Sequence, residues 1–157
     1  MLKYTSCEVV FAEIPNEISL AINISNCPCK CSGCHSPYLA KDIGTLLTPE
    51  KLREIIEENR GITCVCFMGG DSEPRCINSL AKLIKETTDL KVGWYSGRQS
   101  LSADINLEWF DFIKVGPYVE QFGPLNNPNT NQIMYKVVHE NGNNLMFNIT
   151  NKFWKEP

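Results

Sequence analysis

Apolar and polar residues alternate along residues 18–25, and a period of two predicts a β-strand with one buried face. The apolar positions of this alternation are Ile18, Leu20, Ile22 and Ile24. Residues 7–14 are a plausible partner strand. Short apolar runs at residues 62–68, 90–95 and 112–115 predict three further strands, buried in the interior of the protein.

Helical spacing appears between these runs. Thr48, Pro49 and Glu50 have the pattern of a helix N-terminus, with a capping hydroxyl, proline in the first turn and an acidic residue after it. Gly61 is the expected end of this helix. A second amphipathic helix follows the strand at 62–68, and a short helix is expected near residues 106–110. The apolar positions at helical spacing are Leu52, Ile55, Ile56, Ile77, Leu80, Ala81 and Ile84.

Strands that alternate with helices favour an α/β fold with a mainly parallel sheet. The chain has 157 residues, and a complete eightfold βα barrel needs about 250. We therefore expect a partial, open βα barrel formed by one domain over residues 1–157. Residues 134–138 and 145–149, on either side of Asn141-Gly142, predict a C-terminal hairpin.

Charge and hydropathy narrow the classes of partner. The 15 Lys and Arg against 18 Asp and Glu give a net charge of −3, whereas a nucleic-acid-binding domain usually presents a basic face. We therefore expect no direct contact with nucleic acid. No apolar run approaches the roughly 18 residues of a membrane span, so no membrane association is expected. The first residues do not have the pattern of a signal peptide, which favours the cytoplasm.

Cysteine is the unusual feature of the composition. Four of the eight cysteines lie between positions 27 and 34, namely Cys27, Cys29, Cys31 and Cys34. In a reducing compartment such a cluster favours metal binding over disulfides. Cys64 and Cys66, by contrast, lie in an apolar run and are interpreted as buried small hydrophobic residues.

The spacing C-x3-C-x2-C, through Cys27, Cys31 and Cys34, suits an iron–sulfur cluster on a short loop. Three protein ligands for four irons leave one iron open to a further ligand, as in catalytic rather than structural metal sites. Cys29 is expected not to be a ligand, since its spacing beside Cys27 and Cys31 is sterically awkward. Zinc is the alternative, with Cys29 or His35 completing a set of four.

These motifs resemble the radical S-adenosylmethionine superfamily. The sequence Cys34-His35-Ser36-Pro37-Tyr38-Leu39 resembles the segment after the cluster in glycyl-radical activating enzymes. The short chain and the segment Thr130-Asn131-Gln132 make it most similar to the activating proteins of anaerobic (class III) ribonucleoside-triphosphate reductases. The resemblance extends over nearly the whole chain.

The resemblance implies a set of site residues. Cys27, Cys31 and Cys34 match the ligands of a [4Fe-4S] cluster. Met68, Gly69, Gly70 and Asp71 match the family's motif for the amino group of S-adenosylmethionine, and Ser96 and Gly97 match a position beside this cofactor. The chemistry agrees, because glycine allows close backbone approach and a carboxylate pairs with an ammonium. Ligands of such sheets bind beyond the carboxyl ends of the strands, so these motifs are expected to converge.

The function that the resemblance implies is activation of a glycyl-radical protein. The reduced cluster would cleave S-adenosylmethionine to methionine and a 5′-deoxyadenosyl radical, which would take a hydrogen atom from a backbone glycine. The implied partners are the large subunit of the anaerobic ribonucleoside-triphosphate reductase and an electron donor such as flavodoxin. No catalytic side chain is expected, since the cofactors carry the chemistry. The alternatives are an activase of another glycyl-radical enzyme, such as pyruvate formate-lyase, and a non-catalytic zinc or iron–sulfur binding module.

Overall fold

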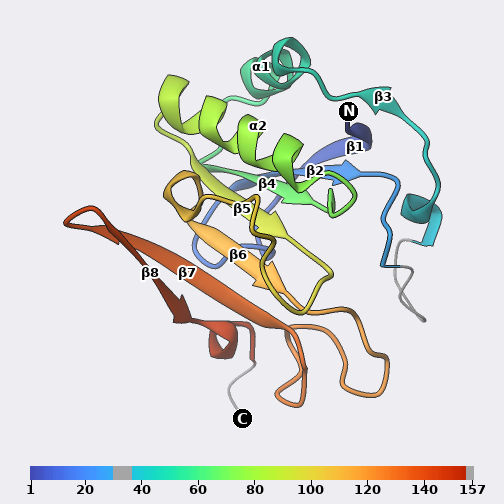
Figure 1. Ribbon diagram of the computed structural model, residues 1–157, viewed down its shortest axis with the longest axis vertical. Helices are drawn as coiled ribbons and strands as arrows, with labels where there is room; N and C mark the ends of the chain where they lie inside the picture. Colours follow the sequence, from blue (N-terminus) through green and yellow to red (C-terminus); the bar gives the residue numbers. More distant parts are fainter. Residues whose placement is uncertain (30–36, 155–157) are drawn as a thin grey trace.

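The computed structural model describes residues 1–29 and 37–154, and these residues form one mixed sheet with two α-helices. Figure 1 shows the order of these elements along the chain. The strands are β1 (Lys3–Val10), β2 (Ser19–Ile24), β3 (Thr45–Leu46), β4 (Cys64–Met68), β5 (Lys91–Tyr95), β6 (Phe112–Val115), β7 (Ile133–Glu140) and β8 (Asn143–Asn148). The helices are α1 (Pro49–Glu58) and α2 (Pro74–Thr87), with 3₁₀ turns η1 (Pro37–Ala40), η2 (Leu107–Trp109) and η3 (Thr150–Phe153).

The sheet has the order β3-β1-β2-β4-β5-β6-β7-β8. Its centre is parallel, because β2, β4, β5 and β6 run in the same direction. The other pairings are antiparallel. The expectation of a mainly parallel sheet is therefore wrong. Helical crossovers connect the central strands only, and the chain reaches both margins of the sheet through turns and loops, which return it in the opposite direction.

The expected hairpin at the C-terminus is present as β7 and β8, which turn at Asn141 and Gly142. Both turn residues have positive φ, at 51° and 78°, which the tight reversal requires. The strand expected at residues 7–14 begins and ends earlier, as β1, and residues 11–18 form its connection to β2. The short strand β3 was not predicted, since two exposed residues carry no periodic signal.

Both helices begin with a proline, Pro49 in α1 and Pro74 in α2, a residue that suits the first turn because it needs no backbone N–H there. In α1 the Thr48 hydroxyl accepts a hydrogen bond from the Lys51 backbone N–H at 3.1 Å, as the capping pattern predicted. In α2 the cap residue Glu73 makes no such bond. Among the described residues, neither helix is long and apolar enough to cross a membrane.

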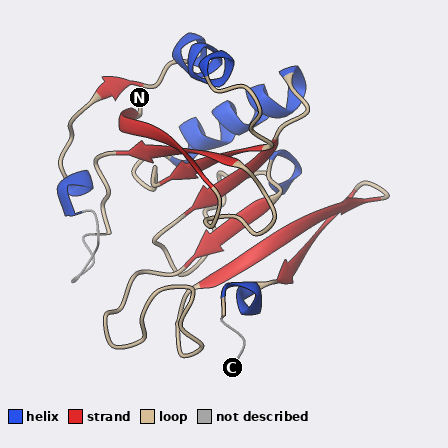
Figure 2. Ribbon diagram, turned by 180° about the vertical axis from the view of Figure 1, so that it is seen from behind, coloured by secondary structure: helices blue, strands red, loops and turns tan. Residues whose placement is uncertain are grey.

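The two faces of the sheet have different coverings (Figures 1 and 2). Alternate residues of the central strands, including Val65, Phe67 and Trp94, pack with the buried faces of α1 and α2 in the larger core. The residues between them form a smaller core with Ile14 and Leu125 from connecting segments and with Phe153 from η3. Helices therefore cover one face, and irregular segments cover the other.

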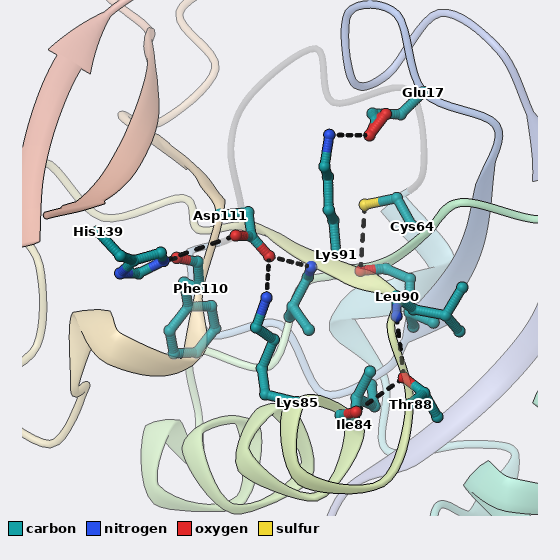
Figure 3. A network of polar contacts seen from close by, with 12 residues as sticks. Glu17, Cys64, Ile84, Lys85, Thr88, Leu90, Lys91, Phe110, Asp111 and His139 are labelled. Atoms are coloured by element: carbon teal, nitrogen blue, oxygen red, sulfur yellow. Dashed lines mark hydrogen bonds and ion pairs between the residues drawn. The ribbon is translucent and has the colours of Figure 1, made fainter.

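A polar network joins α2, β5, β6 and β7 at the end of the sheet where the central strands begin (Figure 3). The Asp111 carboxylate accepts a hydrogen bond from Lys85 Nζ at 2.9 Å and one from the Val92 backbone N–H at 2.9 Å. His139 Nε2 lies 2.9 Å from the Phe110 carbonyl and 3.6 Å from the same carboxylate. Charge-assisted contacts of this kind fix how the helix and the hairpin sit on the sheet.

Candidate cofactor site at the strand ends

The four parallel strands end in register at one edge of the sheet. Asn23, Met68, Tyr95 and Lys114 occupy one row across β2, β4, β5 and β6. The segments that follow these strands are the cysteine loop, Gly69-Gly70-Asp71, Ser96-Gly97 and Gly116. Because parallel strands deliver their carboxyl ends to one edge, motifs far apart in the sequence meet there.

Asp71 is the centre of this edge. Its side chain is buried, with 4% of the residue exposed. Oδ1 accepts a hydrogen bond from the Ser96 hydroxyl at 2.5 Å, and Oδ2 accepts one from the Gly97 backbone N–H at 2.8 Å. The Cys29 thiol is a third donor, with its sulfur 3.8 Å from Oδ2. The structure thus brings Asp71, Ser96 and Gly97 together, as sequence reasoning expected.

The Asp71 carboxylate has no direct ion pair with a cation among the described residues. No lysine, arginine or histidine of residues 1–29 and 37–154 forms an ion pair with its carboxylate. The hydrogen-bond donors that surround it, from Ser96, Gly97 and Cys29, are formally neutral. A buried carboxylate without a cation is costly unless something pairs with it, so this donor set suits a ligand that brings a positive charge.

Gly69 and Gly70 are required by the backbone at this turn. Their φ angles are 108° and 100°, a region that other residues rarely adopt. A Cβ at Gly70 would lie 2.5 Å from the Ile77 Cδ1 atom of α2, so the turn is also packed against the helix. The Trp94 indole N–H donates to the Gly69 carbonyl at 2.7 Å and fixes this peptide. Gly-Gly therefore sets the direction in which Asp71 leaves β4.

Lys114 supports the neighbouring strand end, and sequence reasoning assigned it no role. It is buried, and its ammonium donates to the carbonyls of Ser96 at 3.0 Å and Gly116 at 2.9 Å. The same ammonium lies 5.8 Å from the centre of the Tyr95 ring, within cation–π range. The signal in the sequence was a lysine inside an otherwise apolar strand, which has to find polar partners when it is buried.

The cysteine loop leaves the same edge after β2. Its two sides are joined at the base, where the Asn26 N–H donates to Lys41 O at 2.9 Å and the Cys27 N–H donates to Leu39 O at 2.8 Å. Cys27 is half-buried at this base. Cys31 and Cys34, the other expected ligands, and His35 lie outside the described residues. No group of three metal-binding side chains occurs within residues 1–29 and 37–154.

Cysteines elsewhere in the chain are poor candidates for thiolate ligands. Cys64 and Cys66 are fully buried in β4, which confirms their interpretation as small core residues. Burial raises the pKa of the Cys64 thiol to about 12, and it raises the pKa of Cys66 well above its ordinary value. In β1, burial raises the pKa of Cys7 to about 11. A metal ligand must be the thiolate, so these environments disfavour binding.

A large cleft lies on the face of the sheet opposite the helices. Its volume is about 1020 Å³, and it reaches Met68 and Tyr95 at the ends of β4 and β5. Phe11 and Glu13 line it from the β1–β2 connection. Leu125 and Phe153 line it from segments near the C-terminus. The cleft is therefore next to the strand ends and is walled by irregular segments.

The sequence model of a family described as a 4Fe-4S single cluster domain matches residues 18–115, more than half of the chain. The chain belongs to this 4Fe-4S single cluster domain family. The match begins beside β2 and ends at the last residue of β6, so this cluster domain includes the cysteine loop and the strand ends described above. No curated protein and no solved structure gives a significant match. The protein is an iron–sulfur protein, as the cysteine spacing indicated.

Sequence reasoning did not find every residue of the cluster domain's strand-end site. It predicted Asp71, Ser96 and Gly97 through the resemblance and through their position after strands, and the structure shows that the three residues contact one another. It did not predict that Cys29 would contact Asp71, because the two are 42 residues apart in the chain. The motif at residues 130–132 is also placed near this edge, since the Asn131 side chain donates to the Pro117 carbonyl at 3.0 Å.

Proposed function

We propose that this protein is a radical S-adenosylmethionine enzyme that generates the glycyl radical of an anaerobic ribonucleoside-triphosphate reductase. The observation that carries the proposal is the buried Asp71 carboxylate, which has neutral donors and lies beside a cysteine loop of an iron–sulfur domain. An α-ammonium is the kind of group that such a carboxylate binds. S-adenosylmethionine brings this ammonium together with a sulfonium that can be reduced.

We assign the cluster to Cys27, Cys31 and Cys34. Three thiolates on a short loop suit an iron–sulfur cluster, and they leave one iron available to a ligand of small size. A cluster of this kind supplies one electron and an open coordination position, which is the chemistry that reductive cleavage of a sulfonium needs. The hydrogen bonds between residues 26–27 and 39–41 hold the base of the loop at the edge where Asp71 lies.

The other residues at the strand ends bind and orient. Asp71 accepts the ammonium, and Gly69 and Gly70 supply the positive φ angles of the turn that directs Asp71 toward Ser96 and Gly97. Ser96 and Gly97 hold the carboxylate in place, and Lys114 fixes the carbonyl of Ser96 behind them. The side chains thus contribute positioning and a dry environment, and none of them has to move a proton.

The cleft on the open face is the proposed entry for the partner. A volume of about 1020 Å³ is at the upper end for a small-molecule pocket and suits a loop of polypeptide. The sheet is not closed by any pairing between β3 and β8 among the described strands, so this face is accessible from the side. We propose that the fold is in this sense a partial barrel, and that its missing wall admits the glycine-bearing loop.

The proposal is tested by an assay for glycyl-radical formation on the anaerobic ribonucleoside-triphosphate reductase. The protein is reconstituted with iron and sulfide without oxygen, reduced, and mixed with the reductase and S-adenosylmethionine. We expect a glycyl radical signal by electron paramagnetic resonance that requires both S-adenosylmethionine and Cys31. The matched control is Cys7→Ala, which removes a cysteine from β1, away from the site.

Three results would contradict the proposal. A radical on pyruvate formate-lyase but not on the reductase would assign the protein to a different partner. Stoichiometric zinc in place of iron would assign it to a binding module. No radical on either protein, with the cluster intact and reduced, would leave cluster binding as the only function and would refute the activase assignment.

A further inference from the structure

Cys29 belongs to the cysteine loop by sequence but contacts the strand-end site. Its sulfur lies 3.8 Å from Asp71 Oδ2, the oxygen that also accepts the Gly97 N–H. A Cβ at Gly97 would lie 2.8 Å from this sulfur, 3.2 Å from Cys29 Cβ and 3.7 Å from Oδ2. The sulfur therefore occupies the space that a side chain at position 97 would need, directly beside the carboxylate.

The donors around Asp71 fix its orientation. A carboxylate has about four lone-pair positions, and here Ser96, Gly97 and Cys29 use three of them. The position that is left for an incoming donor is determined by the other three. Without the thiol, Oδ2 would keep only the Gly97 N–H, and water could enter the space beside it and compete with a ligand.

We propose that Cys29 is a positioning residue for ligand binding rather than a cluster ligand. Its thiol holds the Asp71 carboxylate in the orientation that receives an ammonium, and position 97 is glycine because the sulfur fills that space. The proposal rests on the assignment of S-adenosylmethionine as the ligand, and it adds a direct link between the cysteine loop and the ammonium site.

The first test compares Cys29→Ala and Cys29→Ser with the wild type. Each reconstituted protein is assayed for iron content and for S-adenosylmethionine affinity by equilibrium dialysis without oxygen. We expect unchanged iron in both variants. We expect the Kd to rise about threefold to tenfold in Cys29→Ala, the range for losing one modest hydrogen bond, and to return toward the wild-type value in Cys29→Ser, which keeps a donor.

An analogue that lacks the α-amino group separates positioning from general structural damage. If Cys29 acts through Asp71 on the ammonium, Cys29→Ala and the wild type bind this analogue with the same Kd. A structural defect would weaken both ligands. Gly97→Ala is the second variant, because its backbone φ needs no glycine and, among the described residues, its added methyl meets only the Cys29 side chain within 3.4 Å.

The combination of the two substitutions gives a double-mutant cycle. Gly97→Ala alone displaces the sulfur, so its Kd is expected to rise as in Cys29→Ala. In the Cys29→Ala background the 2.8 Å clash with the sulfur is gone and the 3.2 Å approach to the Cβ of residue 29 remains, so the same methyl is expected to change the Kd by less than about twofold. Additive effects of the two substitutions would refute the proposed packing of the sulfur against position 97.

The outcomes distinguish this proposal from the function on which it rests. Loss of iron in Cys29→Ala would make Cys29 a cluster ligand and would overturn the positioning role. Equal affinity of Cys29→Ala and the wild type for S-adenosylmethionine would also overturn it. A wild-type protein that holds its cluster but does not bind S-adenosylmethionine would instead refute the proposed function itself.

Discussion

Replacing Asp71 by asparagine removes the charge of the site and keeps its shape. Asparagine has one carbonyl oxygen, which can accept the Gly97 N–H, and one amide group, which can donate to the Ser96 hydroxyl after that hydroxyl rotates. The folded structure therefore keeps its main contacts. An ammonium ligand, in contrast, loses the carboxylate that we propose it binds.

The structure gives separate expectations for the free energy of unfolding and for the Kd of the ligand. For folding, the three hydrogen bonds to the carboxylate lose their charged partner, but the cost of burying a charge is also removed. We therefore expect a net change of about 1 kcal/mol in the free energy of unfolding and a Tm shift of about 2–4 °C. For binding, losing one partner of a buried charged pair costs about 2–4 kcal/mol, which raises the Kd about 30-fold to 700-fold.

The assay measures both quantities on the same reconstituted protein. Thermal unfolding gives the Tm, and equilibrium dialysis gives the Kd for S-adenosylmethionine and for the analogue without the α-amino group. Asp89→Asn is the matched control, because Asp89 is exposed and the substitution makes the same change in net charge. Asp71→Asn is expected to weaken S-adenosylmethionine binding strongly and analogue binding little.

Two results would refute this reasoning. If the Kd of Asp71→Asn for S-adenosylmethionine stayed within threefold of the wild type, the carboxylate would not bind the ammonium. If the Tm fell by more than about 10 °C, the main role of Asp71 would be to hold the strand ends together, since that shift exceeds what a loss of about 1 kcal/mol produces.

Three further predictions concern the scaffold. Gly70→Ala is expected to lower the free energy of unfolding in urea by about 2–4 kcal/mol, because it adds a clash with Ile77 to an unfavourable φ. Gly61→Ala is the control, with a similar φ and no atom of the described residues within 4 Å of the added Cβ, and an equal loss in both variants would show that the clash has no effect. Asp111→Ala is expected to lower the free energy of unfolding by about 2–4 kcal/mol in the same assay, because it leaves the Lys85 ammonium and the Val92 N–H without this partner. A loss below about 0.5 kcal/mol would contradict the importance of the Asp111 network. Burial raises the pKa of the Cys64 thiol to about 12, so Cys64 is expected to resist iodoacetamide at pH 9 in the folded protein and to react in urea. Peptide mapping measures both reactions, and modification of Cys64 in the folded protein would contradict its burial. The unfolded thiol ionises first, near its ordinary value of 9.0, so Cys64 also makes folding less favourable as pH rises from about 9 to about 12.

The central strands could be predicted from the sequence because they are buried on both faces. The apolar runs at 62–68, 90–95 and 112–115 correspond closely to β4, β5 and β6. The hydrophobic pattern of a strand indicates that it is buried, however, and does not indicate which strand lies next to it in the sheet. The hairpin of β7 and β8 was predicted from its turn, but the antiparallel pairings of β1 with β3 and of β6 with β7 depend on loops without a periodic signal and were not foreseen.

The candidate site could be predicted in part for a similar reason. Asp71, Ser96 and Gly97 follow buried strands directly, and the topology brings their positions together. The contact of Cys29 with Asp71 depends on how the cysteine loop folds back over the strand ends, which spacing along the chain does not encode. Lys114 was a visible anomaly in an apolar strand, but its carbonyl partners could be identified only from the structure.

The central claim is that the iron–sulfur domain cleaves S-adenosylmethionine, and product analysis tests it most directly. The reconstituted protein is reduced without oxygen, S-adenosylmethionine and the reductase, whose glycine supplies the hydrogen atom, are added, and 5′-deoxyadenosine and methionine are quantified. We predict equal amounts of the two products in the wild type and in Cys7→Ala, and none in Cys31→Ala. A brown, reducible protein that binds its cluster and forms neither product would contradict the account.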